Sequence, residues 1–98
     1  MIKRIVKMTF AHDRVNDFLT VFEESKELIR AFKGCEHLEL LNDVNTNNRY
    51  FTLSFWESEA HLENYRQSEL FKSTWAKTKP LFIEKAEAWS VSVKVELL

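Results

Sequence analysis

Three histidines, His12, His37 and His61, are the side chains of this sequence best suited to acid–base or metal chemistry. Their separations match none of the usual metal-ligand spacings, and neither a CxxC nor an HExxH motif is present. The sequence therefore predicts no metal site and no cofactor. His61 is the best candidate for a general base, because an imidazole titrates near neutral pH and Leu62 and Tyr65 would hold it beside an apolar cluster. The alternative is a half-buried histidine that makes a structural hydrogen bond.

The single cysteine, Cys35, is a poor candidate for a nucleophile. It follows the expected C-terminus of a helix, where the negative end of the helix dipole disfavours a thiolate. One cysteine cannot form an internal disulfide, which favours a reducing compartment. The N-terminal residues alternate between charged and apolar side chains too regularly for a signal peptide, and no apolar run approaches the length of a membrane span. We therefore expect a soluble, cytoplasmic protein without a membrane partner.

Composition excludes two further classes of protein. The chain has 98 residues, of which 45% are hydrophobic and 13% aromatic, so it predicts one domain over residues 1–98 with a true core rather than a disordered segment. Fourteen basic and fifteen acidic residues leave a net charge of −1, and no basic run is present. Because a nucleic-acid binder needs a cationic surface, we expect no nucleic-acid partner.

The elements that must position these side chains are centred on residues 49–75, RYFTLSFWESEAHLENYRQSELFKSTW. The first part of this stretch is rich in β-favouring residues and predicts a strand. Ser58 and Ser68 are good N-caps, and each is followed by a short helical pattern, so two short helices are expected. Phe71 and Trp75 lie one helical turn apart and are expected to stack. The changes of direction between this strand and the two short helices are expected to bring many aromatic side chains together.

The remaining elements follow from their hydrophobic periodicity. Residues 2–10 and 36–44 alternate as strands do, and a last strand is expected over residues 86–98. Between the first two strands a broad apolar stripe predicts a long helix, with Asp13 as its N-cap and Gly34 at its left-handed C′ position. The resulting order, β-α-β-β-α-β, is the ferredoxin-like α+β fold, in which a four-stranded antiparallel sheet carries its helices on one face.

The third expected strand is apolar on both of its faces, with Phe51, Leu53 and Phe55 on one and Tyr50 and Trp56 on the other. A sheet with one solvated face should alternate more cleanly than this. The chain has no spare element to cover the second face. We therefore expect a homodimer in which two sheets pack face to face.

With these elements in place, the chain resembles the antibiotic biosynthesis monooxygenase family of small, dimeric α+β barrel proteins. The resemblance rests on the first strand, MIKRIVKMTF, on the helix end, KGCEHLELL, and on the segments FTLSFWESEAHLENYRQSE and LFKSTW. It implies the ferredoxin-like fold and the dimeric barrel. Members of this family oxidise phenolic or quinol-type substrates with molecular oxygen and no cofactor, degrade haem, or act on small signalling carbonyl compounds.

Alignment with the haem-degrading branch places Trp75 where that branch has its haem-ligating histidine. Tyr65 stands in place of a tryptophan of that branch, and Val6 in place of an asparagine. Without an imidazole near position 75, the iron has no obvious donor. The resemblance therefore argues against haem degradation.

For the cofactor-independent branch, the resemblance implies a closed, apolar pocket between the sheet and the helices. In this interpretation His61 takes the proton of the substrate, and the resulting anion reacts with oxygen. The same apolar side chains could instead be ordinary core. The residues expected to line the substrate pocket are Val6, Met8, Phe22, Tyr65, Phe71 and Trp75.

Two hypotheses about function remain. The first is a cofactor-independent monooxygenase that acts on a small aromatic, phenolic or quinol-type substrate. The second is a non-catalytic or stress-associated dimer of the same fold that binds a small molecule. A pocket with room for a bicyclic substrate would favour the first, and a pocket filled by Tyr65, Phe71 and Trp75 would favour the second.

Overall fold

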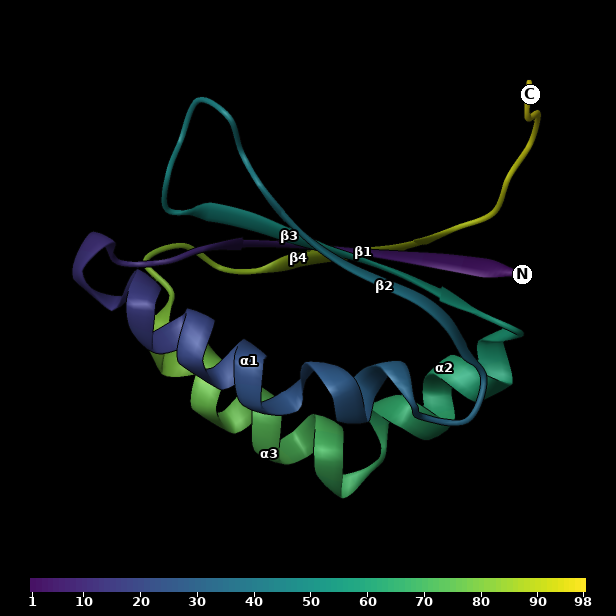
Figure 1. Ribbon diagram of the computed structural model, residues 1–98, viewed down its shortest axis with the longest axis horizontal. Helices are drawn as coiled ribbons and strands as arrows, with labels where there is room; N and C mark the ends of the chain where they lie inside the picture. The colour runs from purple at the N-terminus through teal and green to yellow at the C-terminus, as the bar shows by residue number, and fades with distance from the viewer.

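The computed structural model describes residues 1–98 as one antiparallel sheet and a layer of helices. The strands lie in the order β2-β3-β1-β4, and the three helices cover one face of the sheet (Figure 1). This is the ferredoxin-like α+β fold that the sequence predicts. The elements are β1 (Ile2–Thr9), η1 (His12–Arg14), α1 (Val15–Arg30), β2 (Cys35–Asn42), β3 (Arg49–Trp56), α2 (Glu59–Arg66), α3 (Glu69–Thr78), η2 (Lys79–Leu81) and β4 (Glu87–Val91).

The two short helices begin at the predicted caps. The Ser58 side chain accepts a hydrogen bond from the backbone N–H of His61 at 3.2 Å, and the Ser68 side chain accepts one from Phe71 at 3.1 Å. The prediction of Asp13 as the N-cap of the long helix is wrong. Asp13 lies inside the 3-10 turn η1, and the cap position of α1 is Arg14, which makes no side-chain capping bond.

Gly34 lies in the turn after α1 rather than at the predicted C′ position, because α1 already ends at Arg30. The turn is closed by the N–H of Cys35, which donates to the carbonyl of Phe32 at 2.9 Å. Gly34 has φ +92°, the one positive φ in the chain. A Cβ atom at this position would lie 2.5 Å from side-chain atoms of His61. A glycine is thus required both by the backbone conformation and by the close approach of α2.

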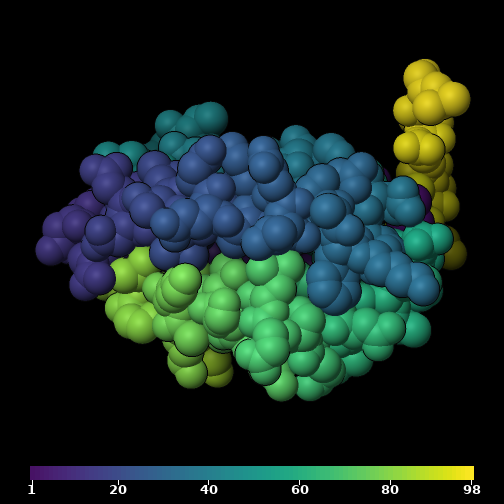
Figure 2. All heavy atoms as spheres, turned by 60° about the horizontal axis from the view of Figure 1, so that its bottom comes forward, coloured from purple at the N-terminus to yellow at the C-terminus, as the bar shows by residue number.

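The last strand is shorter than the sequence predicts. It ends at Val91, which pairs with Lys3, so almost nothing of β1 remains beyond that point to bond with a longer strand. Residues 92–98 leave the sheet and project from the body of the molecule (Figures 1 and 2). The alternating apolar side chains of this segment, such as Val93 and Val95, are therefore exposed.

The core consists of two separate clusters between the sheet and the helices. The larger one surrounds the fully buried Phe10, which stacks on Phe18 with ring centroids 4.2 Å apart. The smaller one surrounds the fully buried Trp56 and includes Cys35 and Leu62. Each cluster joins helices to sheet at one end of the layer.

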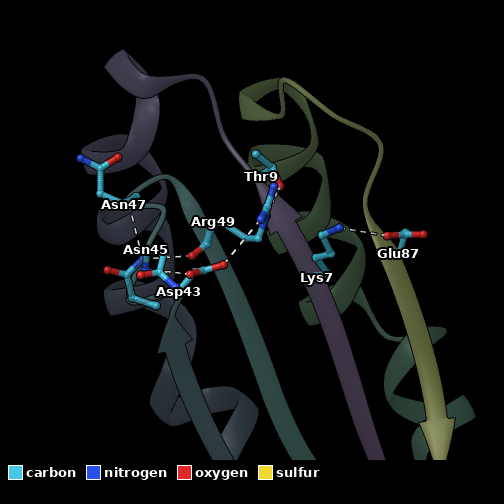
Figure 3. Close-up of polar contacts among 8 residues, drawn as sticks. Lys7, Thr9, Asp43, Asn45, Asn47, Arg49 and Glu87 are labelled. Carbon is cyan, nitrogen blue, oxygen red and sulfur yellow. Dashed lines mark hydrogen bonds and ion pairs between the residues drawn. The ribbon is translucent and has the colours of Figure 1, made fainter.

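The other face of the sheet carries no helix (Figure 1). As predicted, β3 is apolar on this side as well. Thr52 and its even-numbered neighbours face the helices, so Phe51, Leu53 and Phe55 face away from them. At one end of this face Lys7 meets Glu87 at 3.4 Å and the Arg49–Asp43 pair is 3.5 Å apart (Figure 3), and toward the other end His37 lies 2.9 Å from Glu39. The apolar residues of this face, here named the open face, are Ile5, Leu41, Phe51, Leu53, Phe55, Trp89 and Val91.

The turn at Gly34 gives a first testable prediction. Gly34→Ala should lower the free energy of unfolding by about 1–3 kcal/mol, because alanine is strained at this φ and its Cβ overlaps His61. Thermal denaturation measures the loss, and the neighbouring exposed Lys33→Ala is the control. Adding His61→Ala removes the ring atoms from the overlap but leaves the Cβ of residue 61 at 2.5 Å and the backbone strain, so the double variant should recover only part of the stability. Full stability of Gly34→Ala alone would contradict both the strain and the overlap.

Candidate substrate pocket

A cavity of about 310 Å³ separates the two core clusters. Its floor is the sheet, and its walls and roof come from α1, α2 and α3. All the residues that the sequence predicts as pocket-lining contribute to it, although no ligand tests their role: Val6, Met8, Phe22, Tyr65, Phe71 and Trp75.

The cavity exists because the sheet presents small side chains at its centre. The helix-facing residues of β3 are Tyr50, Thr52, Ser54 and Trp56, so two bulky residues flank two small ones. The next strand, β1, pairs its Val6 with Thr52. On the far side of β1, strand β4 places Ala88 beside Val6. Side chains of this size do not reach the helices, and an unfilled space remains between the ends.

Aromatic rings from β3, α2 and α3 form a continuous wall along the cavity. Trp56 stacks on Tyr65 with centroids 4.9 Å apart, and Tyr65 meets the edge of Phe71 at 5.3 Å. Phe71 and Trp75 stack at 5.9 Å with an interplanar angle of 10°, as their spacing predicts. Trp75 then contacts Phe82 at 5.5 Å. These rings hold one another in place, so they line the cavity without filling it.

Few polar groups face this cavity, and two of its hydroxyls already have partners. Ser54 accepts a hydrogen bond from the indole N–H of Trp56 at 3.0 Å, and Thr78 donates to the carbonyl of Thr74 at 2.7 Å. Burial, with a smaller contribution from Cys35, raises the pKa of the Tyr65 hydroxyl far above its ordinary value. Tyr65 is therefore a neutral phenol at physiological pH. The charged lining residues are Arg4, Arg66 and Glu87.

His61 does not line the cavity. Its Nδ1 lies 2.7 Å from the Ser58 hydroxyl, its Nε2 lies 3.8 Å from Glu57, and its side chain packs over Gly34. The first turn of α2 thus directs the ring toward the α1–β2 turn instead of toward Tyr65. This position fits the alternative interpretation, a histidine with a structural hydrogen bond, better than the role of general base.

The other residues considered for chemistry lie elsewhere. His12 is in the exposed turn η1, and His37 is on the open face, where its Nε2 is 2.9 Å from Glu39. Burial raises the pKa of the Cys35 thiol, in agreement with its expected low reactivity. No three His, Cys, Asp or Glu side chains are grouped so that they could hold a metal ion. None of the helices has the length and hydrophobicity that a membrane-spanning helix requires.

Comparison with known proteins identifies the family. Residues 1–77 match the family described as antibiotic biosynthesis monooxygenase. This chain belongs to that family. A search of curated proteins gave no match. The family assignment agrees with the resemblance drawn from the sequence, and the fold is the one that the resemblance implies.

Several solved structures share the fold of this family member at low sequence identity. A conserved protein from Methanosarcina mazei superposes with a TM-score of 0.91 at 17% identity, over 95% of this chain and 92% of its own. Rv0793 from Mycobacterium tuberculosis gives 0.89 at 15%, covering 97% and 96%. A variant of SnoaB, a cofactor-independent oxygenase from Streptomyces nogalater, gives 0.87 at 14%, covering 98% and 95%. At these identities the likeness shows the fold alone.

Arg4, Arg66, Thr52 and Ser54 line the cavity but were not predicted from the sequence. A usable signal for the two small residues was present, because Thr52 and Ser54 fall between Tyr50 and Trp56 on the helix-facing side of one strand. For Arg4 the signal was its alternation with Val6 and Met8, which places a guanidinium on the covered face of β1.

Filling the cavity gives a second prediction. Thr52→Leu should weaken binding of 1-naphthol by about tenfold or more, a loss of about 1.4 kcal/mol, because the larger side chain occupies the space. Its melting temperature should not fall, since the added apolar atoms enter an empty region. Calorimetric titration and thermal denaturation measure the two effects. Thr52→Val, which keeps the volume, is the control. Unchanged naphthol binding in Thr52→Leu would mean that the ligand lies elsewhere.

Proposed function

We propose that this protein is a cofactor-independent monooxygenase that oxidises a small aromatic substrate of the phenol or quinol type. The observation that carries the proposal is the cavity of about 310 Å³ between the two core clusters. Membership of the antibiotic biosynthesis monooxygenase family supports it. The volume is at the lower end of the range for small-molecule sites and suits one or two fused rings.

The aromatic wall fits such a substrate. A planar ring placed in the cavity would meet the Phe71–Trp75 stack on the helix side and Val6 and Thr52 on the sheet side. Few polar groups compete for it, so shape and stacking would set most of the orientation. Exclusion of water is useful here, because a reactive oxygen intermediate is then less exposed to side reactions.

The proposed reaction needs no electrons beyond those of the substrate. Loss of the phenolic proton gives an anion whose charge extends to the ring carbons ortho and para to the oxygen, and the reaction takes place at one of these carbons that bears hydrogen, which in a quinol is an ortho carbon. One electron passes to O₂, and the two radicals join in a new carbon–oxygen bond, which gives a hydroperoxide after proton uptake. The C–H bond at that carbon and the O–O bond then break, and water leaves. One phenol and one O₂ thus give one quinone and one water.

The walls of the cavity also bear on the haem-degrading alternative. Trp75 lines the cavity at the position expected from the sequence, and no histidine lines it. An imidazole ligand for haem iron would have to come from outside the lining residues. Haem degradation therefore remains disfavoured for this chain.

One observation favours the second candidate, a binding protein without catalysis. His61 lies outside the cavity, and Glu87, the one acidic lining residue, is paired with Lys7 at 3.4 Å. No unpaired side chain therefore stands ready to take a proton from a bound phenol. For catalysis, the phenol must enter as its anion or lose its proton to water.

Oxygen uptake tests the proposal, with a panel of hydroquinones and anthrone-like phenols and with metal chelated throughout. Protein-dependent uptake is expected, and added catalase should return no oxygen, because the oxygen is reduced to water rather than peroxide. Trp75→Ala should raise KM or change the preferred substrate, since it removes part of the wall. His61→Ala should keep its turnover, because the ring lies outside the cavity. Binding of these phenols without any oxygen uptake would establish the non-catalytic candidate instead.

The open face supports a homodimer as part of the same proposal. Its apolar residues belong to all four strands and include Trp89 and Leu41, which are 45% and 41% exposed. Such a surface is costly to leave in water, and a second copy would cover it with an identical sheet. The covered interface should be large and rather apolar.

Light scattering at micromolar concentration should therefore give the mass of a dimer. Leu53→Glu places a charge at the centre of the open face and should produce monomers. Leu28→Glu is the matched control, because Leu28 is 61% exposed on α1, away from the sheet. A monomeric wild type, or a dimer that Leu53→Glu leaves intact, would contradict the face-to-face arrangement.

A further inference from the structure

We infer that Arg4 and Arg66 form an anion subsite at one end of the cavity, which holds the aromatic substrate as an ionised phenol or enol. This inference deepens the proposed function and rests on it for the aromatic nature of the ligand. It assigns to two guanidinium groups the ionisation step that His61, outside the cavity, does not perform.

Arg4 occupies an unusual place for a charged residue. It lies on the central strand β1, on the face that the helices cover, and it lines the cavity. Its neighbours across the sheet are Ser54 and Ser90, whose short side chains leave space around the guanidinium. One of its nitrogens, Nη1, donates to the Ser90 hydroxyl at 3.0 Å. A guanidinium carries five N–H donors, so most of those on Arg4 have no protein acceptor.

Arg66 approaches the same end of the cavity from the last turn of α2. Its Nη1 donates to Glu63 at 3.2 Å. Arg4, by contrast, makes no salt bridge. Burial, and secondly the nearby Arg66, lower the pKa of Arg4, while Glu63 opposes this effect. Both guanidinium groups line the same cavity, so an anion bound there would be attracted to both of them.

The charges around this end of the cavity do not cancel. Arg4 comes from β1 and Arg66 and Glu63 from α2, whereas Glu87 of β4 lies opposite Lys7, three residues further along β1. Glu87 is paired with Lys7, and Glu63 offsets one of the two guanidiniums. One positive charge is left over beside an apolar cavity. The Arg66 side chain is 44% exposed and pairs with Glu63, whereas Arg4 is half-buried and has no carboxylate partner, so a bound oxyanion would supply the partner that Arg4 lacks.

The chemical consequence is that the subsite can replace a general base. A phenol bound beside two guanidiniums has its ionised form stabilised, so its pKa falls and its proton can leave to water. The anion is then held by N–H donors at its oxygen, while its ring extends toward the aromatic wall. It is the anion that reacts readily with oxygen. The same two guanidinium groups would therefore both bind the substrate and favour its ionised form.

A coloured probe tests this directly. 4-Nitro-1-naphthol ionises to an anion that absorbs visible light, so a pH titration with the protein in excess reports the pKa of the bound probe. The wild-type protein should lower the pKa of the bound probe by about one pH unit or more relative to the free probe. Arg4→Gln and Arg66→Gln should each restore most of the free value, and Arg4→Lys, which keeps the charge, should retain part of the effect. Lys72→Gln, an exposed charge on α3, is the control.

The methyl ether of the probe cannot ionise and separates charge recognition from cavity shape. It should bind equally well to the wild type and to Arg4→Gln, whereas the ionised naphthol should bind Arg4→Gln about tenfold or more weakly. An unchanged pKa of the bound naphthol, or an equal loss for ether and anion, would overturn the anion subsite alone. Failure of both compounds to bind would overturn the subsite and the pocket together. A lowered pKa without oxygen uptake would leave the subsite standing and remove the catalytic function.

Discussion

The rest of this structure depends on the contact between the helix layer and the sheet at two ends only. Phe10 at one end and Trp56 at the other are fully buried and anchor the two core clusters. Between them the sheet offers Val6, Thr52 and Ala88, which are too small to reach the helices. A protein interior normally closes such gaps, because unfilled space forfeits dispersion contacts and hydrophobic burial. The unfilled centre of this small core is therefore the feature that supports the proposal of a binding site.

The turn at Gly34 shows how close packing also fixes the neighbouring helix. The glycine carbonyl accepts the N–H of Glu57 at 2.9 Å, and its missing side chain leaves space for His61. Ser58 caps α2 and also lies within 2.7 Å of the His61 ring. These contacts lock the first turn of α2 against the end of α1, so that Tyr65, one turn later, is presented to Trp56 and the cavity. The His61 ring thus belongs to this turn and not to the wall of the pocket.

Much of this architecture can be predicted from the sequence, since it follows from short-range rules. Alternation locates the strands, Ser58 and Ser68 indicate where their helices begin, and the spacing of Phe71 and Trp75 predicts their stack. Two of the failures, the orientation of His61 and the length of β4, depend on contacts distant in sequence. The orientation of His61 is set by Gly34. The end of β4 is set by the length of β1, which has almost no residue left to pair beyond Lys3. Helical periodicity alone contains neither constraint.

The cavity and the open face lie on opposite sides of the same strands, which links assembly to function. Along β3, Thr52 and Ser54 face the cavity, while Leu53 and Phe55 face away from the helices. A shift of β3 by one residue would place Leu53 and Phe55 in the cavity and Thr52 and Ser54 on the open face. Once the open face is covered, packing on both sides of the strand therefore fixes its register. A second copy on that face would stabilise the strand that forms the floor of the pocket. It would also hold Arg4, on the adjacent strand, at a fixed distance from α2. In a core this small, the subunit interface would then supply the rigidity that the unfilled centre cannot.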